Sequence, residues 1–247
     1  SCRLFTMTTV LVTGANRGIG IGLVEQFLKN NSVSHVFATA RDPGAAKELN
    51  ALACDRLTVI KMAVDDDASI KHAADEVAKA VAESGLDILV NNAGIAKMIN
   101  VKVPVDRAQL AEQFNVNTYG PIIVVSYFYE LLKKAAAKKG KAQVAHISST
   151  AGSSGVGLGP IRGLQLAAYG GSKSALNRYS AFCSKDFADD KIRSTCFCPG
   201  WVQTDMGGKA AEFTIEESTS KLSKLILDLG EEHNGGYYNI KGEVIPW

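Results

Sequence analysis

The chain has 247 residues, a length at which an α/β fold forms either one large domain or two small ones. Hydrophobic residues make up 46% of the sequence, enough for a sizeable core, and interspersed charges of both signs give a formal net charge of +2. This balance argues against a nucleic-acid-binding or membrane-binding surface, and no apolar run approaches the length of a membrane span.

The cysteine content argues against a disulfide framework. The five cysteines are Cys2, Cys54, Cys183, Cys196 and Cys198. Their number is odd and their spacing forms no Cys-x-x-Cys or Cys/His pair, so we expect reduced thiols, no bound metal and a cytoplasmic protein. We expect residues 1–7 to be an N-terminal extension and residues 8–247 to form a single domain.

Short apolar runs alternate with helical patterns along the chain. Strands are predicted at residues 10–12, 35–40, 57–62, 86–90, 144–147, 192–197 and 236–240. Helices are predicted directly after the first strand and at residues 45–52, 68–83, 106–134, 168–188 and 216–229. The alternation predicts an α/β fold: one doubly wound parallel sheet of the Rossmann type, with helices on both faces. Ligands of such a sheet bind beyond the carboxyl ends of the strands.

A glycine turn follows the first predicted strand. Gly14, Gly18 and Gly20 lie in this turn, and Ile19, Leu23 and Phe27 then recur every four residues on one helical face. Strand, glycine turn and helix start together predict a phosphate site, because the glycines admit the anion to the first free N–H groups of the helix. The spacing differs from Gly-x-Gly-x-x-Gly, so an ordinary tight turn is the alternative.

Arginines predict which nucleotide is bound. Arg41 follows the second strand, where an acidic residue would bind the ribose hydroxyls of NAD, and Arg17 lies inside the glycine turn. Two guanidinium groups that converge on one 2′-phosphate favour NADP over NAD. Two alternatives remain: both arginines are ordinary surface residues, or a different register lets Asp42 bind the ribose.

The later strand ends also carry candidate residues. Asn91-Asn-Ala-Gly94 follows the fourth strand, where small residues let the backbone lie against a cofactor and asparagine amides tie strand ends together. Pro199 and Gly200 end the sixth strand, and Thr204 offers a hydroxyl to a bound amide.

Tyr169 and Lys173 are one helical turn apart and share a face. A lysine ammonium beside a phenol lowers the pKa of the phenol and makes it a usable acid or base. With seven tyrosines and many lysines in the chain, the pair by itself is weak support, and a helix-start tyrosine with a solvated lysine is the alternative.

Taken together, these stretches resemble the short-chain dehydrogenase/reductase family over essentially the whole chain. The matching pieces are Thr13-Gly-Ala-Asn-Arg-Gly-Ile-Gly20, Asn91-Asn-Ala-Gly94, Asn117, Ser149, Tyr169 with Lys173, and Pro199-Gly200. Within the family, the Asn-Arg-Gly-Ile-Gly turn and the run Pro199-Gly-Trp-Val-Gln-Thr-Asp look most like sniffer-type carbonyl reductases and norsolorinic acid ketoreductases.

The resemblance implies a division of roles. Tyr169 would donate a proton to a carbonyl oxygen as hydride arrives from the nicotinamide, and Ser149 would polarise that carbonyl. Lys173 would lower the pKa of Tyr169 and bind the nicotinamide ribose, and Asn117 would hold a water that links Lys173 to solvent. The residues expected to bind NADP (NADPH) are Gly14, Asn16, Arg17, Gly18, Ile19, Gly20, Arg41, Ala63, Val64, Asn91, Ala93, Gly94, Tyr169, Lys173, Pro199, Gly200, Val202 and Thr204.

Two departures from the family pattern bear on these roles. Ala63 stands where the family usually has an Asp that meets the adenine, so recognition would rest on the backbone of Ala63 and Val64 or on Asp65. The gap from Ser149 to Tyr169 is longer than usual, and the extra residues are expected at 153–165. Ser149 is the expected catalytic serine, since Ser148 should face away if the strand continues to that point.

Three functions are compatible with this sequence. The first is NADPH-dependent reduction of a bulky ketone or aldehyde, with a small-molecule substrate held against an apolar wall. The candidates for that wall are Trp201, Leu158, Ile161 and Met206. The second is NAD-dependent oxidation of a secondary alcohol, and the third is a cofactor-binding sensor without turnover. A homo-oligomer, dimer or tetramer, is expected through the two long helices at residues 106–134 and 168–188.

Overall fold

Strands and helices alternate from the first described residue onward. The computed structural model describes residues 7–100, 102–156 and 166–247. The first half contains β1 (Thr8–Val12), α1 (Gly18–Lys29), β2 (Val33–Ala40), a 3-10 turn (Pro43–Ala45), α2 (Lys47–Ala51), β3 (Leu57–Lys61), α3 (Asp67–Val81) and β4 (Ile88–Asn91). The expected extension at residues 1–7 lies outside the described residues except for Met7.

The second half continues the same pattern. Its elements are α4 (Arg107–Phe114), a π-helical turn (Asn115–Tyr119), α5 (Gly120–Lys139), β5 (Ala142–Ile147), a 3-10 turn (Thr150–Gly152), α6 (Ala167–Asp186), β6 (Ile192–Cys198), α7 (Ile215–Leu227), a 3-10 turn (Glu231–His233) and β7 (Tyr237–Asn239).

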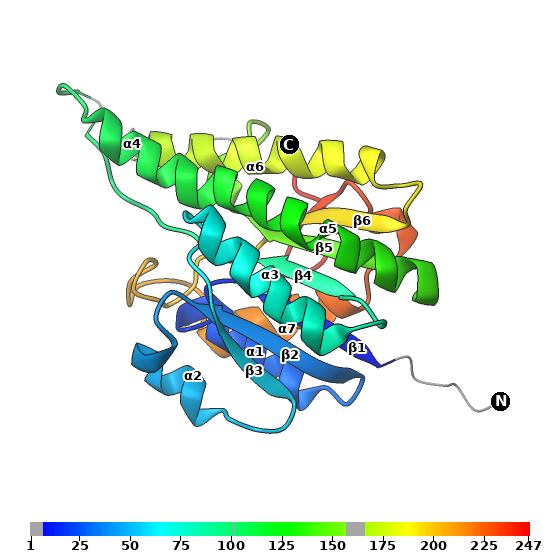
Figure 1. Cartoon of the computed structure of the whole chain (residues 1–247). Coiled ribbons are helices and arrows are strands. Elements are labelled where there is room, and N and C mark those ends of the chain that lie inside the picture. The colour runs from blue at the N-terminus through cyan, green and yellow to red at the C-terminus, as the bar shows by residue number, and fades with distance from the viewer. Residues whose placement is uncertain (1–6, 101, 157–165) are drawn as a thin grey trace.

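The strands form one parallel sheet, as predicted. Seven strands lie in the order β3-β2-β1-β4-β5-β6-β7, and each neighbouring pair is parallel (Figure 1). The order reverses between β1 and β4, because the chain first builds outward to β3 and then returns to the other side of β1. A crevice at the carboxyl ends of β1 and β4 is where such a sheet binds its ligand.

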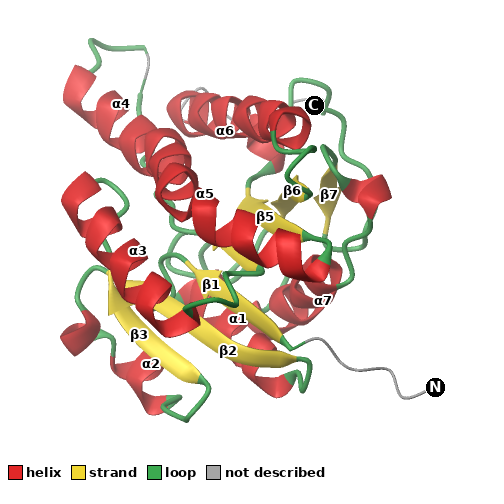
Figure 2. Cartoon of the chain, turned by 45° about the vertical axis from the view of Figure 1, so that its right-hand side comes forward, coloured by secondary structure: helices red, strands yellow, loops and turns green. Residues whose placement is uncertain are grey.

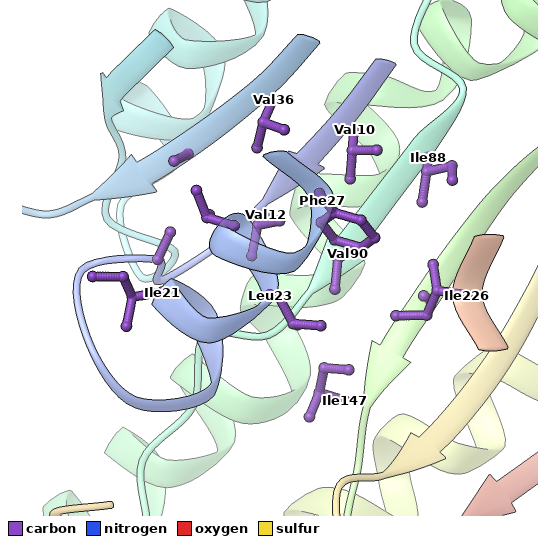
Figure 3. Close-up of a cluster of buried hydrophobic side chains, with 14 of the residues drawn as sticks. Val10, Val12, Ile21, Leu23, Phe27, Val36, Ile88, Val90, Ile147 and Ile226 are labelled. Carbon is purple, nitrogen blue, oxygen red and sulfur yellow. The ribbon is translucent and has the colours of Figure 1, made fainter. Parts of the chain in front are cut away.

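Two apolar layers cover the sheet. Alternate residues of β1 point to opposite faces, so Val10 and Val12 join one core cluster and Leu11 joins the other. Helices α1, α2 and α7 contribute to the first cluster, in which Phe27 packs (Figure 3). Helices α3 and α5 contribute to the second. Figure 2 shows the strands between these two helical layers. The predicted doubly wound architecture of a single domain is confirmed.

Two predicted helices differ from the observed ones. The helix expected at residues 45–52 is a 3-10 turn followed by the short α2, because Ala46 takes a non-helical conformation between them. The helix expected at residues 106–134 is interrupted by the π-helical turn and continues to Lys139, where Gly140 ends it in the left-handed conformation. The lysines near its end led the prediction to stop the helix too early, because the buried residues Ala135 and Ala136 extend the helical face beyond them.

Candidate functional site

The turn between β1 and α1 brings its backbone against the end of β4. Gly14 has φ +62° and Gly18 has φ +57°, a region that favours glycine. A side-chain carbon on Gly14 would lie 2.9 Å from the Cα atom of Ala93, and one on Gly20 would lie 2.3 Å from the carbonyl oxygen of Gly14. The start of α1 has no side-chain cap and no acidic residue in its first turn, so its N–H groups suit a phosphate.

Other predicted residues of this turn differ in exposure. Asn16 and Arg17 are exposed, whereas Ile19 is partly buried and packs against the core. The guanidinium of Arg17 forms an ion pair with Asp205, with 2.8 Å between Nη1 and Oδ2. Arg41 is exposed just beyond the end of β2. Both arginines thus lie at the carboxyl edge of the sheet, and Arg17 already has an acidic partner there.

The residues after β3 present mainly backbone groups. The N–H of Ala63 donates to the Ser69 hydroxyl (3.0 Å), and Val64 is buried. A side-chain carbon on Gly120 would lie 2.7 Å from the carbonyl oxygen of Val64. Asp65 is exposed. The proposed adenine contacts of Ala63 and Val64 stay a prediction.

The asparagines after β4 have different roles. Asn92, which was not among the predicted residues, ties the strand ends together, since its Nδ2 donates to the carbonyl oxygens of Thr13 (2.8 Å) and Gly14 (3.1 Å). Asn91 instead points into the sheet interior, where its Nδ2 lies 3.4 Å from Nδ1 of His146. Any contact of Asn91 with a cofactor would therefore use its backbone.

Thr13 completes the connection between β1 and β4. Its hydroxyl accepts from the N–H groups of Asn92 (3.0 Å) and Ala93 (2.9 Å). These bonds hold Ala93 and Gly94 beside the glycine turn, and their expected contact with a cofactor stays a prediction. Thr13 follows the first strand directly, so its position in the sequence was a usable signal that the prediction overlooked.

The two serines after β5 face opposite ways. Ser148 is buried and its hydroxyl donates to Oδ1 of Asn177 (2.5 Å). Ser149 is half-buried, accepts from the N–H of Ala151 (3.2 Å), and hydrogen-bonds the phenol of Tyr169. The geometry supports Ser149 rather than Ser148 as the serine of the site.

Tyr169 and Lys173 project from the first turns of α6 toward the ends of β5 and β6. Burial raises the pKa of Tyr169 to about 12, and the Ser149 hydrogen bond opposes that rise. Burial lowers the pKa of Lys173 to about 8, opposed by the thiols of Cys196 and Cys198. The pKa of the phenol thus lies above its ordinary value, whereas a lowered pKa was expected. The ammonium nitrogen lies 6.0 Å from the ring centroid and donates to the carbonyl oxygen of Ile147 (2.8 Å).

Asn117 lies in the π-helical turn beside Lys173. Its Oδ1 accepts from the N–H of Ile95 (2.8 Å), and its Nδ2 donates to the carbonyl oxygen of Ile95 (2.8 Å) and to the Ser172 hydroxyl (3.0 Å). A side-chain carbon on Gly94 would lie 3.3 Å from this Oδ1 and 3.5 Å from Nζ of Lys173. Helix α6, the end of β4 and the π-helical turn therefore meet at Gly94.

The segment after β6 folds back over the glycine turn. Pro199 accepts from the Ser218 hydroxyl (2.7 Å), and Gly200 turns the chain with φ +80°. Val202 is buried and pairs with Phe213. A side-chain carbon on Gly18 would lie 3.3 Å from the methyl of Thr204, so this segment contacts the turn directly.

The predicted apolar wall is partly described. Trp201 and Met206 are exposed, at 56% and 54%, and the indole of Trp201 donates to the carbonyl oxygen of Gly207 (2.8 Å). Leu158 and Ile161 lie outside the described residues. Asp205, the partner of Arg17, was missed as a site residue although it ends the run that carried the closer resemblance.

Among the described residues, no three His, Cys, Asp or Glu side chains gather as a metal-binding group. No helix in the described part of the chain is long and apolar enough to cross a bilayer. Cys54, Cys183, Cys196 and Cys198 are free thiols, and Cys196 and Cys198 are buried in a small core cluster.

Known proteins resemble this chain in sequence and in fold. A model of the short chain dehydrogenase family matches residues 8–214. An NADPH-bound carbonyl reductase from chicken fatty liver is similar in structure, with a TM-score of 0.91, 37% identity, and coverage of 98% of this chain and 99% of that one. The carbonyl reductase Sniffer of D. melanogaster matches with a TM-score of 0.91, 33% identity, and coverage of 98% and 100%.

A curated relative points the same way. An uncharacterised oxidoreductase of Schizosaccharomyces pombe is 33% identical over 261 residues, which cover 98% of this chain and 99% of that protein. Together with the parallel sheet and the residues at its strand ends, these matches show that the chain belongs to the short-chain dehydrogenase/reductase family.

Proposed function

We propose that this oxidoreductase reduces a ketone or aldehyde to an alcohol with NADPH. The observation that carries the proposal is the meeting of four side chains at the ends of β5 and β6, where Ser149 lies beside the phenol of the half-buried Tyr169 and Lys173 and Asn117 lie next to them. A phenol whose pKa is raised to about 12 keeps its proton at neutral pH, and reduction of a carbonyl needs a proton donor.

The residues divide the reaction between them. A bound nicotinamide supplies the hydride for the carbonyl carbon. The Tyr169 phenol donates its proton to the carbonyl oxygen, and the Ser149 hydroxyl hydrogen-bonds that oxygen as negative charge develops on it. The Lys173 ammonium stabilises the phenolate that remains, and Asn117 fixes the backbone around Ile95 next to Gly94.

The glycine turn fits the phosphates of such a cofactor. Side-chain carbons on Gly14 and Gly20 would clash with neighbouring backbone, so the chain lies close there and leaves the start of α1 open. Arg17 and Arg41 support NADPH rather than NADH. Asp42 supports the same choice, because its carboxylate accepts from the N–H of Ala45 (3.3 Å) as the cap of a 3-10 turn.

The NADPH-bound state of the chicken carbonyl reductase lends further support, since that protein shares 37% of its residues with this chain. NAD-dependent oxidation of a secondary alcohol would use the same catalytic residues. The two arginines distinguish the alternatives.

The test is a panel of aldehydes, small ketones and polycyclic quinones with NADPH, followed by absorbance of the nicotinamide. We expect turnover with at least one class, and Tyr169→Phe should lower kcat by about a hundredfold or more, because the proton donor is lost. A Tyr169→Phe variant as active as the wild type would contradict the proposal and favour a cofactor-binding sensor without turnover. Tyr127→Phe, an exposed tyrosine on α5, is the matched control.

A further inference from the structure

The loop that follows Ser149 has two separate supports. On one side α6 holds its first part, since the Ser174 hydroxyl (2.8 Å) and Nδ2 of Asn177 (3.1 Å) both donate to the carbonyl oxygen of Gly152. A side-chain carbon on Gly152 would lie 2.7 Å from Cβ of Lys173, so this part packs tightly on the helix. Residues 153–156 lie further along the same loop.

The segment 237–247 supplies the second support. After β7 the chain turns back on itself, with Tyr238 and Val244 in an antiparallel bridge and the N–H of Ile245 donating to the carbonyl oxygen of Tyr237 (2.7 Å). The segment then reaches the loop, where the N–H of Gly155 donates to the main-chain oxygen of Trp247 (2.8 Å).

Side chains reinforce this contact. The Ser153 hydroxyl donates to the carbonyl oxygen of Pro246, and the same hydroxyl accepts from the N–H of Val156 (3.0 Å). A side-chain carbon on Gly155 would lie 2.7 Å from Cβ of Pro246. The loop and the segment are therefore closely packed against each other.

An aromatic stack anchors the segment to the sheet. The rings of Tyr237 and Trp247 are stacked, with centroids 5.5 Å apart and planes inclined by 25°. Tyr237 is buried, and Ile245 joins a cluster with Cys196 and Cys198 of β6, against which Val156 of the loop packs. Loop, segment and β6 thus share one small core.

Tyr237 also lies within electrostatic range of Tyr169. Burial raises its pKa, and the thiols of Cys198 and Cys196 and the phenol of Tyr169 act in the same direction, while the Ser148 hydroxyl opposes it. The stacked tyrosine therefore lies near both Tyr169 and the end of β5. A substitution at Trp247 can therefore affect the site through Tyr237.

We propose that segment 237–247 is a brace that positions loop 149–156, with Trp247 as a positioning residue that acts through Tyr237 and Gly155 and so sets the fit of the carbonyl substrate. The part of this inference that concerns substrate rests on the proposed function. The brace itself is a property of the free protein.

Amide hydrogen exchange of the free protein tests the brace. Trp247→Leu keeps an apolar side chain and removes the stacked ring, so amides at residues 150–156 should exchange about tenfold faster or more. Trp247→Phe keeps a ring and should restore protection, and Val244→Ala, in the same segment but with an outward side chain, should change nothing. Amides of β3, at the far edge of the sheet, report any global loss of stability.

Kinetics test the consequence for the site. Trp247→Leu should lower kcat/KM for the carbonyl substrate about tenfold while KM for NADPH stays unchanged, and Trp247→Phe should recover most of that loss. Unchanged exchange at residues 150–156 would overturn the proposal, and so would faster exchange with unaltered carbonyl kinetics. Wild-type protein with no NADPH-dependent turnover would overturn the proposed function instead, and the exchange result would still decide the brace.

A second variant covers the case in which Trp247→Leu does not fold. Gly155→Ala places a carbon 2.7 Å from Pro246 and must push loop and segment apart, so it should give the same local exchange and the same kinetic pattern. Val244→Ala again serves as the control, because its side chain points outward and takes no part in the contact.

Discussion

Burial moves the pKa values of the two central side chains in opposite directions. It raises the pKa of Tyr169 to about 12 and lowers that of Lys173 to about 8. As pH rises, the ammonium of Lys173 therefore loses its proton well before the phenol does. At neutral pH the site holds a protonated acid beside a largely charged lysine, the combination that carbonyl reduction requires.

This order predicts how reduction depends on pH. We expect kcat/KM for the carbonyl to be constant below about pH 7 and to fall above about pH 8, because the phenolate left by proton transfer loses its neighbouring positive charge. Initial rates across this range measure it. Lys173→Arg keeps the charge and should move the decline to higher pH. A rate that stays constant well beyond pH 8 in the wild type would show that the charge of Lys173 is not needed.

Arg41 is predicted to discriminate between cofactors. Arg41→Ala should raise KM for NADPH about tenfold and leave KM for NADH nearly unchanged, since a charge-assisted bond to the 2′-phosphate is worth roughly 1.5–3 kcal/mol. Lys47→Ala removes an exposed cation from α2 and serves as the control. If NADPH binding is unaffected by Arg41→Ala, the argument for NADP preference is wrong, and NAD-dependent oxidation becomes the better reading.

Strand β5 carries a buried histidine directly before the site. His146 is inaccessible to solvent, with Nδ1 3.4 Å from Nδ2 of Asn91 and its ring edge-on to Tyr179. Burial lowers its pKa from 6.5 to about 3, and the charge of Lys173 adds to that shift. The neutral imidazole is thus part of the polar layer between the sheet and α6.

That histidine should make the sheet sensitive to acid. Its folded pKa is below its unfolded pKa, so its contribution to stability is complete above about pH 6.5 and is lost as pH falls toward 3. His146→Gln should flatten the decline in the free energy of unfolding over this window by as much as roughly 4 kcal/mol, measured by urea denaturation at several pH values. His72→Gln, at an exposed histidine of α3, should leave the decline as it is. An equal decline in the wild type and His146→Gln would contradict the assignment.

The molecule as a whole places its site at one edge of the sheet and leaves α5 and α6 on its outer surface (Figure 1). Aromatic side chains on and beside these helices are exposed: Tyr119 by 52%, Tyr127 by 40% and Phe182 by 53%. Large exposed aromatic side chains are typical of surfaces that bind another protein.

We therefore expect a homo-oligomer, dimer or tetramer, that associates through α5 and α6. Sedimentation velocity of the wild type should show a mass of at least two chains, and Phe182→Asp should shift it toward one chain, since an apolar ring of the interface would be replaced by a charge that must lose its water there. Trp201→Asp alters an aromatic residue that is equally exposed but lies next to the site, and should leave the mass unchanged. A monomeric wild type would refute this expectation.

Features that depend on neighbouring residues could be predicted from the amino-acid sequence alone. Apolar periodicity marked the seven strands and their parallel arrangement, because strand and helix periods are local properties of the chain. The glycines of the first turn were also predictable, because a left-handed backbone conformation such as that of Gly14 favours glycine at that same position. The four-residue spacing of Tyr169 and Lys173 was enough to predict that they share one face of a helix.

Features that depend on burial and on distant contacts emerge only in the folded chain. It showed that Asn92 rather than Asn91 ties the strand ends, that Arg17 pairs with Asp205, and that burial raises the pKa of Tyr169. It also brought segment 237–247 against the loop after Ser149. These features follow from packing between residues far apart in the chain. The spacing of residues along the sequence does not predict such packing.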